Sequence, residues 1–214
     1  TAIVHYSAVV SGWPEGTFAA HAQYGLCWSY YKKQDFAKCV GAVTTLNERY
    51  ATSELAQKSL YIRAMAEYQH GEFSAAADDA RAFLDSKPPR KDALDAEYLL
   101  GLAYAAQQKF SEAAQTYTGI LTSDAKYTDA DKVLYELGWA CFELAQKNES
   151  IAAFQRLGTE FPDSPLAAES WFRVGESHYD AGEFVDAIKA YSESVSKAST
   201  ENAEICEKAA HKRG

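Results

Sequence analysis

The sequence predicts an all-α fold, a solenoid in which antiparallel helix hairpins stack one on the next. Five alanines recur every 37 residues along the 214-residue chain, and a fixed period of this length is typical of helical repeat proteins. They are Ala19, Ala56, Ala93, Ala130 and Ala167. Two series of small residues keep this period and lie 12 residues apart within a repeat, as expected where two helices cross closely. The first series is Cys27, Ala64, Gly101, Gly138 and Gly175, and the second is Cys39, Ala76, Ala113, Ser150 and Ala187.

The period assigns each stretch of the chain to an element. Residues 1–18 are expected to form the second helix and exit loop of an incomplete repeat. Five full repeats follow, at 19–55, 56–92, 93–129, 130–166 and 167–200. Residues 201–214 then begin a further repeat or form a capping helix. Because neighbouring repeats share their core, we expect one continuous domain, and because both end helices lack a partner, a longer natural protein.

The positions of proline and glycine in the chain agree with a helical fold. All five prolines fall after a second helix, in keeping with the disruption that proline causes inside one. Gly71 and Gly182 lie in the turns within repeats, where a left-handed backbone closes a helix. The alternating β-branched pattern of strands is missing. A bulky position, expected in the core, recurs as Phe36, Phe73, Phe110 and Phe184, with Lys147 replacing phenylalanine in the fourth repeat.

Composition excludes several function classes. A net charge of −9 and a pI near 5.1, with scattered Lys and Arg, argue against a nucleic-acid partner. No apolar run reaches the length of a membrane span, so we expect no direct membrane insertion. Four cysteines without CxxC spacing predict no metal site. No phosphate-binding glycine loop or nucleophile motif occurs, so we expect neither a cofactor nor catalytic residues, and no enzyme activity.

The stretch from Ala168 to Val195 resembles a tetratricopeptide repeat. Its large, small and aromatic positions match that family's pattern, and weaker matches extend over about nine tenths of the chain. The matching residues include Trp171, Val174, Gly175, Tyr179, Phe184, Ala187, Ile188 and Tyr191. The resemblance implies a right-handed superhelix whose first helices line a concave surface that binds ligands.

The loops between repeats resemble those of one group of tetratricopeptide-repeat proteins. They read WPEGTFA, YATSELA and FPDSPLA, each three residues longer than the usual repeat allows. Such loops are similar to those of bacterial envelope proteins, namely the Tol-Pal coordinator and the outer-membrane assembly lipoproteins. The resemblance therefore implies a periplasmic or envelope location, with the cytoplasm as the alternative.

Aromatic rows along the first helices are the candidate binding site. One row begins at Tyr24 and a second lies four residues further on, so both share one face of each helix. The rows comprise Tyr24, Trp28, Tyr61, Met65, Tyr98, Leu102, Tyr135, Trp139, Phe172 and Glu176. Rigid rings dominate binding hot spots, so the rows predict a groove for a peptide or helix of a partner protein. The alternative interpretation is that these rings only fill the spaces between stacked helices.

Two further hypotheses concern the cysteines and the chain ends. Cys27 and Cys39 occupy the two small positions of one repeat, where they could form a disulfide or serve as buried thiols. Ile3, Val9 and Val10 are expected to be exposed on a helix without its partner, which would favour self-assembly over a partner-binding scaffold. A regulatory appendage of a larger enzyme is the third alternative.

Overall fold

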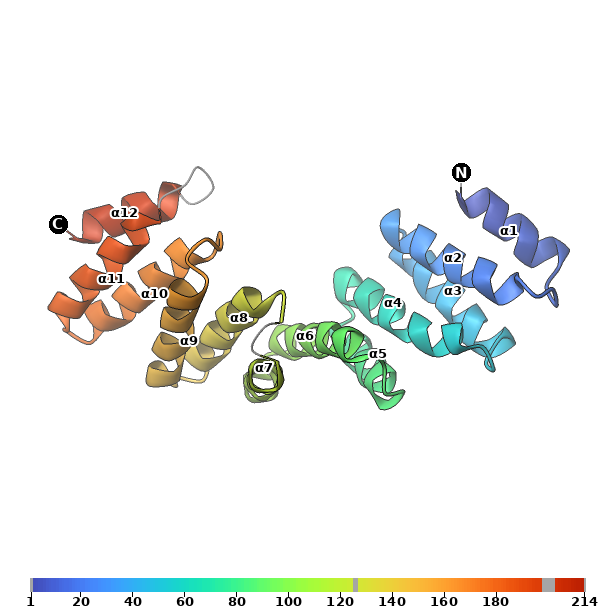
Figure 1. The fold of residues 1–214 in the computed structure, drawn as a ribbon, viewed down its shortest axis with the longest axis horizontal. Helices are drawn as coiled ribbons and strands as arrows, with labels where there is room; N and C mark the ends of the chain where they lie inside the picture. Colours follow the sequence, from blue (N-terminus) through green and yellow to red (C-terminus); the bar gives the residue numbers. More distant parts are fainter. Residues whose placement is uncertain (1, 125–126, 198–202, 214) are drawn as a thin grey trace. The chain divides into compact units, whose positions relative to one another are not determined.

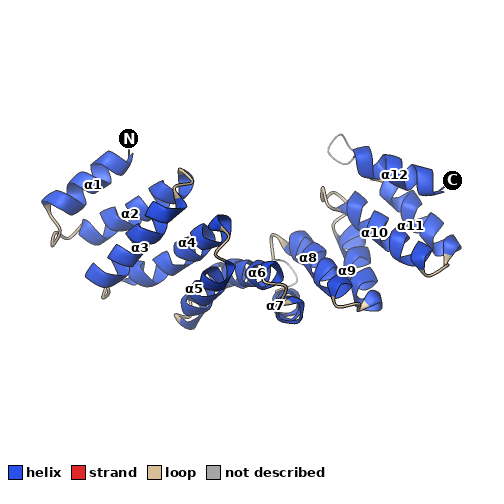
Figure 2. Cartoon of the chain, turned by 180° about the vertical axis from the view of Figure 1, so that it is seen from behind, coloured by secondary structure: helices blue, strands red, loops and turns tan. Residues whose placement is uncertain are grey.

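The computed structural model describes residues 2–124, 127–197 and 203–213, and helices are the regular secondary structure of these residues (Figures 1 and 2). The contacts divide the chain into two compact units, residues 1–108 and 109–214. Unit 1 contains α1 (Ala2–Gly12), α2 (Ala19–Lys32), α3 (Phe36–Arg49), α4 (Glu54–His70), α5 (Phe73–Asp85) and α6 (Arg90–Ala106). Unit 2 contains α7 (Phe110–Ser123), α8 (Ala130–Glu143), α9 (Lys147–Glu160), α10 (Ala167–Asp180), α11 (Phe184–Ser196) and α12 (Ala203–Arg213).

Each unit is a stack of helix hairpins, as the period predicts. In unit 1, α2 pairs with α3 and α4 with α5, while α1, α3 and α5 each pack on the following first helix. The first helices α2, α4 and α6 also contact one another in series. In unit 2, α8 pairs with α9 and α10 with α11, and α12 packs on α11 and α10. The boundary at Gln108 and Lys109 lies inside the predicted repeat 93–129, a division that the prediction of one continuous domain did not contain.

The small residues lie at the helix crossings, as predicted. Cys27, Cys39, Ala64 and Ala76 have no exposed surface, and the alanines that mark the period are all buried. A Cβ added at Gly138 would lie 2.6 Å from the ring of Phe154. The equivalent addition at Gly175 would lie 2.5 Å from the ring of Tyr191, so larger side chains would force these helices apart.

The turns within repeats share one backbone conformation. Gly71 and Gly182 have φ of 87° and 77°, which confirms the predicted left-handed turns. The same position of the other three repeats also has positive φ, 60° at Gln34, 60° at Gln108 and 57° at Ala145. Sequence reasoning recognised only the glycines, because glutamine and alanine do not signal a conformation that costs them energy.

Two packing expectations were wrong. Phe36, Phe73 and Phe110 begin second helices and are only half-buried, and Phe184 is 57% exposed. The aromatic core is formed instead two turns further along the second helices, by Tyr117, Phe154 and Tyr191, each at most 2% exposed. Near the start of the chain, Ile3, Val9 and Val10 are partly buried, and Ile3 and Val10 pack on the core around Cys27, so these side chains do not form an exposed apolar surface.

Candidate partner-binding face

The predicted aromatic rows lie on the first helices of each unit, and we call this surface the first-helix face. In unit 1 it carries six of the predicted residues, all half-buried, on three helices of which α4 contacts both α2 and α6. They are Tyr24 and Trp28 on α2, Tyr61 and Met65 on α4, and Tyr98 and Leu102 on α6. Tyr24, Trp28 and Met65 pack against the core around Cys27 on one side. Because the remaining surface of each side chain is exposed, the row is both packing and surface.

A shallow pocket of about 430 Å³ opens at one end of this face, between α1 and α2. Tyr6, Tyr24 and Trp28 contribute its aromatic walls, and His21 and Lys32 add basic groups. The ring of Trp28 meets Tyr31 edge-on, with 5.9 Å between centroids. Such edge-to-face pairs hold aromatic side chains in fixed positions and lower the entropy that a ligand contact would cost.

In unit 2 the first-helix face centres on Tyr135 and Trp139 of α8. Both rings meet the buried Phe154 edge-on, with centroids 5.8 Å and 6.0 Å away. Arg173 of α10 covers Trp139, its guanidinium carbon 4.7 Å from the ring centroid, and donates a hydrogen bond of 2.9 Å to Glu169. Burial, more than any neighbouring group, raises the pKa of Tyr135 to about 12, so its hydroxyl is neutral at physiological pH.

Two of the predicted residues have structural roles instead. Phe172 is 6% exposed and packs in the core with its ring 5.7 Å from that of Tyr191. Glu176 accepts a hydrogen bond from the Tyr191 hydroxyl and lies 3.3 Å from the Lys212 ammonium group. The fifth repeat therefore turns these positions inward, toward α11 and α12, and we do not assign Phe172 or Glu176 to the binding face.

Cys27 and Cys39 lie at one helix crossing, as predicted, but both are free thiols. The Cys39 thiol donates to the backbone carbonyl of Cys27 over 3.4 Å, and the Cys27 thiol donates to that of Gln23 over 3.2 Å. Burial raises the pKa of Cys27 to about 12 and that of Cys39 to about 11, which keeps both thiols protonated and unreactive. The structure corrects the disulfide hypothesis in favour of its alternative, small buried side chains.

A buried charge cluster in unit 1 was missed. The Arg63 guanidinium donates two hydrogen bonds to the carboxylate of Asp79, and its Nε atom lies 3.9 Å from Glu67. Glu67 and Asp79 are 9% and 8% exposed. The sequence did contain a signal for this cluster, because Arg63 is the charged member of a series that is otherwise apolar. The other members of the series are Leu26, Leu100, Leu137 and Val174.

Across residues 2–124, 127–197 and 203–213 no group of three or more His, Cys, Asp or Glu side chains is placed to hold a metal ion. Within the same residues no helix has both the length and the apolar character that crossing a bilayer requires. His178 bonds Glu183 across the turn at 2.6 Å, as a hydrogen-bonded structural histidine would.

Stacked hairpins with small residues at their crossings and aromatic rows on their first helices define a tetratricopeptide-repeat solenoid. The fold is that of YrrB, described as a TPR protein with an unusual peptide-binding site, at a TM-score of 0.71 and 10% identity, covering 96% of this chain and 97% of that one. MamA matches with a TM-score of 0.72 and 14% identity, covering 85% of this chain and 93% of that one. BtubC from P. vanneervenii matches with a TM-score of 0.70 and 13% identity, covering 94% of this chain and 89% of that one. The chain belongs to the family described as YfiO, outer membrane lipoprotein, whose model matches residues 36–176. No curated protein sequence matches the chain.

Proposed function

We propose that this protein is an interaction scaffold that holds a segment of a partner protein against its first-helix face. One observation carries the proposal: α2, α4 and α6 contact in series, and each presents a pair of half-buried apolar residues at the same two positions. A row of anchored rings of this kind offers large apolar contact area at low entropic cost. Peptides bind such surfaces as extended segments or as amphipathic helices.

Unit 2 supports the same function with fewer residues. Tyr135 and Trp139 repeat the pair on α8, and the Arg173 group over Trp139 adds a cation beside the ring. The proposed binding residues are therefore Tyr24, Trp28, Tyr61, Met65, Tyr98, Leu102, Tyr135 and Trp139. The family of outer-membrane lipoproteins favours a partner in the bacterial envelope, and envelope association is part of the proposal.

Affinity capture from a bacterial envelope extract tests this proposal. The bait is the chain itself beside a Trp28→Ala, Tyr61→Ala double variant, both confirmed as helical by circular dichroism. Loss of two aromatic anchors is expected to weaken binding by at least tenfold, because each anchor of this type contributes about 2 kcal/mol. A partner retained by the original chain and lost by the variant would support the scaffold.

The matched control is Phe184→Ala, which removes a ring that is 57% exposed and lies at the start of α11, outside the first-helix face. Capture should be unchanged by this substitution. If the double variant retained the same proteins in the same amounts, the aromatic rows would be packing alone, and the scaffold proposal would be wrong for this face.

A further inference from the structure

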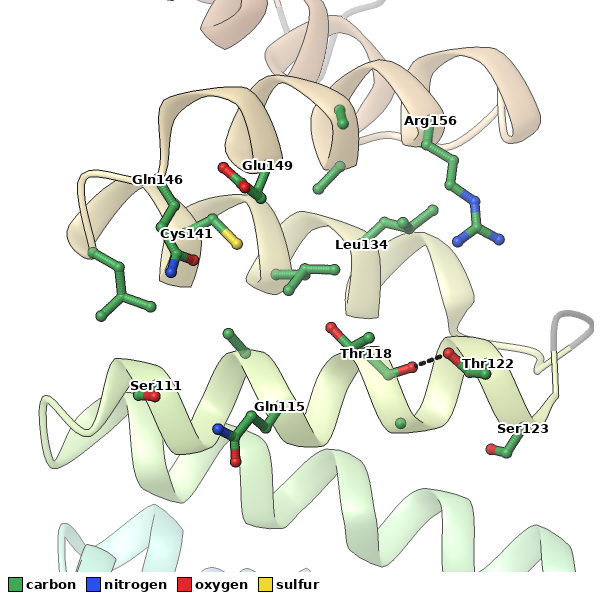
Figure 3. A pocket seen from close by; sticks show the side chains of 16 residues that line it. Ser111, Gln115, Thr118, Thr122, Ser123, Leu134, Cys141, Gln146, Glu149 and Arg156 are labelled. Carbon is green, nitrogen blue, oxygen red and sulfur yellow. Dashed lines mark hydrogen bonds between the residues drawn. The ribbon is translucent and has the colours of Figure 1, made fainter.

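A groove on the opposite side of α8 from the aromatic pair is a feature of unit 2 that the proposed function does not use. It encloses about 870 Å³ between the second helices α7 and α9. Leu134, Leu137 and Cys141 of α8 give it an apolar lining, together with Ala114 of α7 and Ala152 of α9. Leu134 and Cys141 lie on α8, between α7 and α9, in Figure 3. We call this feature the second-helix groove. A volume of this size is within the range of ligand-binding sites, about 300–1,000 Å³.

The same positions are occupied differently elsewhere in the chain. Leu137, Cys141 and Ala153 line the groove. The residues two periods, or 74 positions, before them are Arg63, Glu67 and Asp79, which form the charge cluster of unit 1. One period after Leu134 comes Trp171, whose indole packs against Gly158 so closely that an added Cβ would overlap it. The groove therefore reflects residues particular to the fourth repeat and is not a general property of the stacked hairpins.

Charge distinguishes the two ends of the groove. Glu149, Gln146 and Cys141 lie toward one end, and Arg156, Thr122 and Ser123 lie toward the other (Figure 3). Arg156 already pairs with Glu160 at 2.8 Å. Among the described residues no basic side chain forms an ion pair with Glu149. Glu149 also contributes, after burial, to the raised pKa of Cys141. A positive group of a ligand would be attracted to the Glu149 end.

We propose that the second-helix groove binds an amphipathic helix of a partner protein, with leucine-like side chains against its apolar lining and a basic residue facing Glu149. Small residues on both α7 and α9 let a helix approach closely, as in ridge-into-groove packing. Hydrophobic floors with polar rims are the surfaces to which amphipathic helices bind through residues spaced three, four and seven apart. This site is independent of the first-helix face, since Leu134 and Leu137 share a side of α8 that differs from that of Tyr135 and Trp139.

A synthetic peptide provides the test. The probe is a fluorescein-labelled amphipathic helix of about 15 residues with leucines on one face and two lysines at one end. Fluorescence anisotropy with the full 214-residue chain is expected to give saturable binding. A second peptide with the leucines replaced by serine should not bind, and a third with the lysines replaced by glutamate should bind up to about fivefold more weakly.

Two substitutions of glycine to tryptophan locate the binding. A Cβ added at Gly119, which lines the groove on α7, meets no atom within 4 Å, so Gly119→Trp fills the groove without disturbing the helix. We expect at least tenfold weaker peptide binding. Gly41→Trp is the matched control on α3 of unit 1, where an added Cβ likewise meets nothing within 4 Å, and it should leave affinity unchanged.

Three results would overturn the assignment. They are no saturable binding of the leucine peptide, equal affinity of the Gly119→Trp variant, and equal weakening by both tryptophan variants. Self-association of the unlabelled chain that Gly119→Trp abolishes would assign the groove to a second copy instead of a partner helix. Trp139→Ala on the first-helix face should not change peptide affinity, so this test is separate from that of the proposed scaffold function.

Discussion

At the scale of single residues, the cluster of Arg63, Glu67 and Asp79 is the most consequential departure from the repeat pattern. Asp79 takes both hydrogen bonds of the Arg63 guanidinium, which leaves Glu67 against a second carboxylate with 9% of its surface exposed. Burial first, and then the charge of Asp79, raise the pKa of Glu67 to about 8 from an ordinary 4.5. Glu67 is therefore protonated in the folded state at neutral pH.

This proton makes the stability of the protein depend on pH. Between about pH 4.5 and 8 the folded state binds a proton that the unfolded state has released, so the stabilisation is present at low pH and is lost as the pH rises through 8. Glu67→Gln should remove this dependence and raise the free energy of unfolding at pH 8 relative to the original chain. Urea titrations from pH 5 to pH 9 measure it.

The control for this titration is Glu54→Gln. Glu54 forms an exposed ion pair with Lys58, 3.3 Å apart, and its neutralisation should leave the shape of the pH profile unchanged. A Glu67→Gln variant with the same pH profile as the original chain would mean that Glu67 is ionised in the folded protein.

At the scale of elements, the turn between the two helices of a hairpin is set by one backbone conformation. Gln34, Gly71, Gln108, Ala145 and Gly182 stand 37 residues apart, and all have positive φ. An L-residue with a side chain pays about 1–2 kcal/mol for this conformation, and glycine does not. The hairpin geometry is therefore imposed by the packing of the two helices, even where the turn residue disfavours it.

Exchanging the turn residues should change stability in opposite directions. Ala145→Gly is expected to raise the free energy of unfolding by about 1 kcal/mol, and Gly182→Ala to lower it by a similar amount. Ala181→Gly is the control, since Ala181 is exposed and has a right-handed backbone, φ −82°, where glycine destabilises. Urea unfolding monitored by circular dichroism measures all three. A loss of stability in Ala145→Gly would contradict the strain argument.

At the scale of the whole molecule, the division at Gln108 and Lys109 gives each unit its own core. Unit 1 contains clusters around Cys27 and around Ala76, and unit 2 contains clusters around Phe154 and around Tyr191. In repeat proteins stability is a sum of local terms, so damage to one core need not unfold the other. The four buried cysteines are natural reporters, because two lie in each unit.

Ile62→Ala should uncouple the unfolding of the two units. Ile62 has no exposed surface, and its truncation is expected to cost about 2–5 kcal/mol. Pulsed thiol labelling across a urea series should then modify Cys27 and Cys39 at lower urea, with the labelling of Cys141 and Cys206 unchanged. An equal shift for all four cysteines would show that the chain unfolds as a single cooperative unit.

The sequence by itself determined the class of fold, the order of the helices and the family resemblance. This was possible because each position of the repeat favours one type of residue. Small residues recur at the helix crossings, prolines lie outside the helices, and aromatic residues recur on the first-helix face. Gly71 and Gly182 were recognised in the same way, since glycine signals a left-handed turn. Single-sequence patterns of this kind report local geometry and the nearest neighbour along the chain.

Only the tertiary structure decided which members of a series depart from it. Phe172 and Glu176 turn inward because Tyr191 and α12 pack against them, and Phe184 is exposed although its position is filled by phenylalanine in other repeats. Arg63 is half-buried and pairs with Asp79 of the next helix, and the second-helix groove is lined by Leu134 at the position that Trp171 fills one period later. Each of these outcomes depends on side chains from two or three helices at once, which a one-dimensional period does not specify.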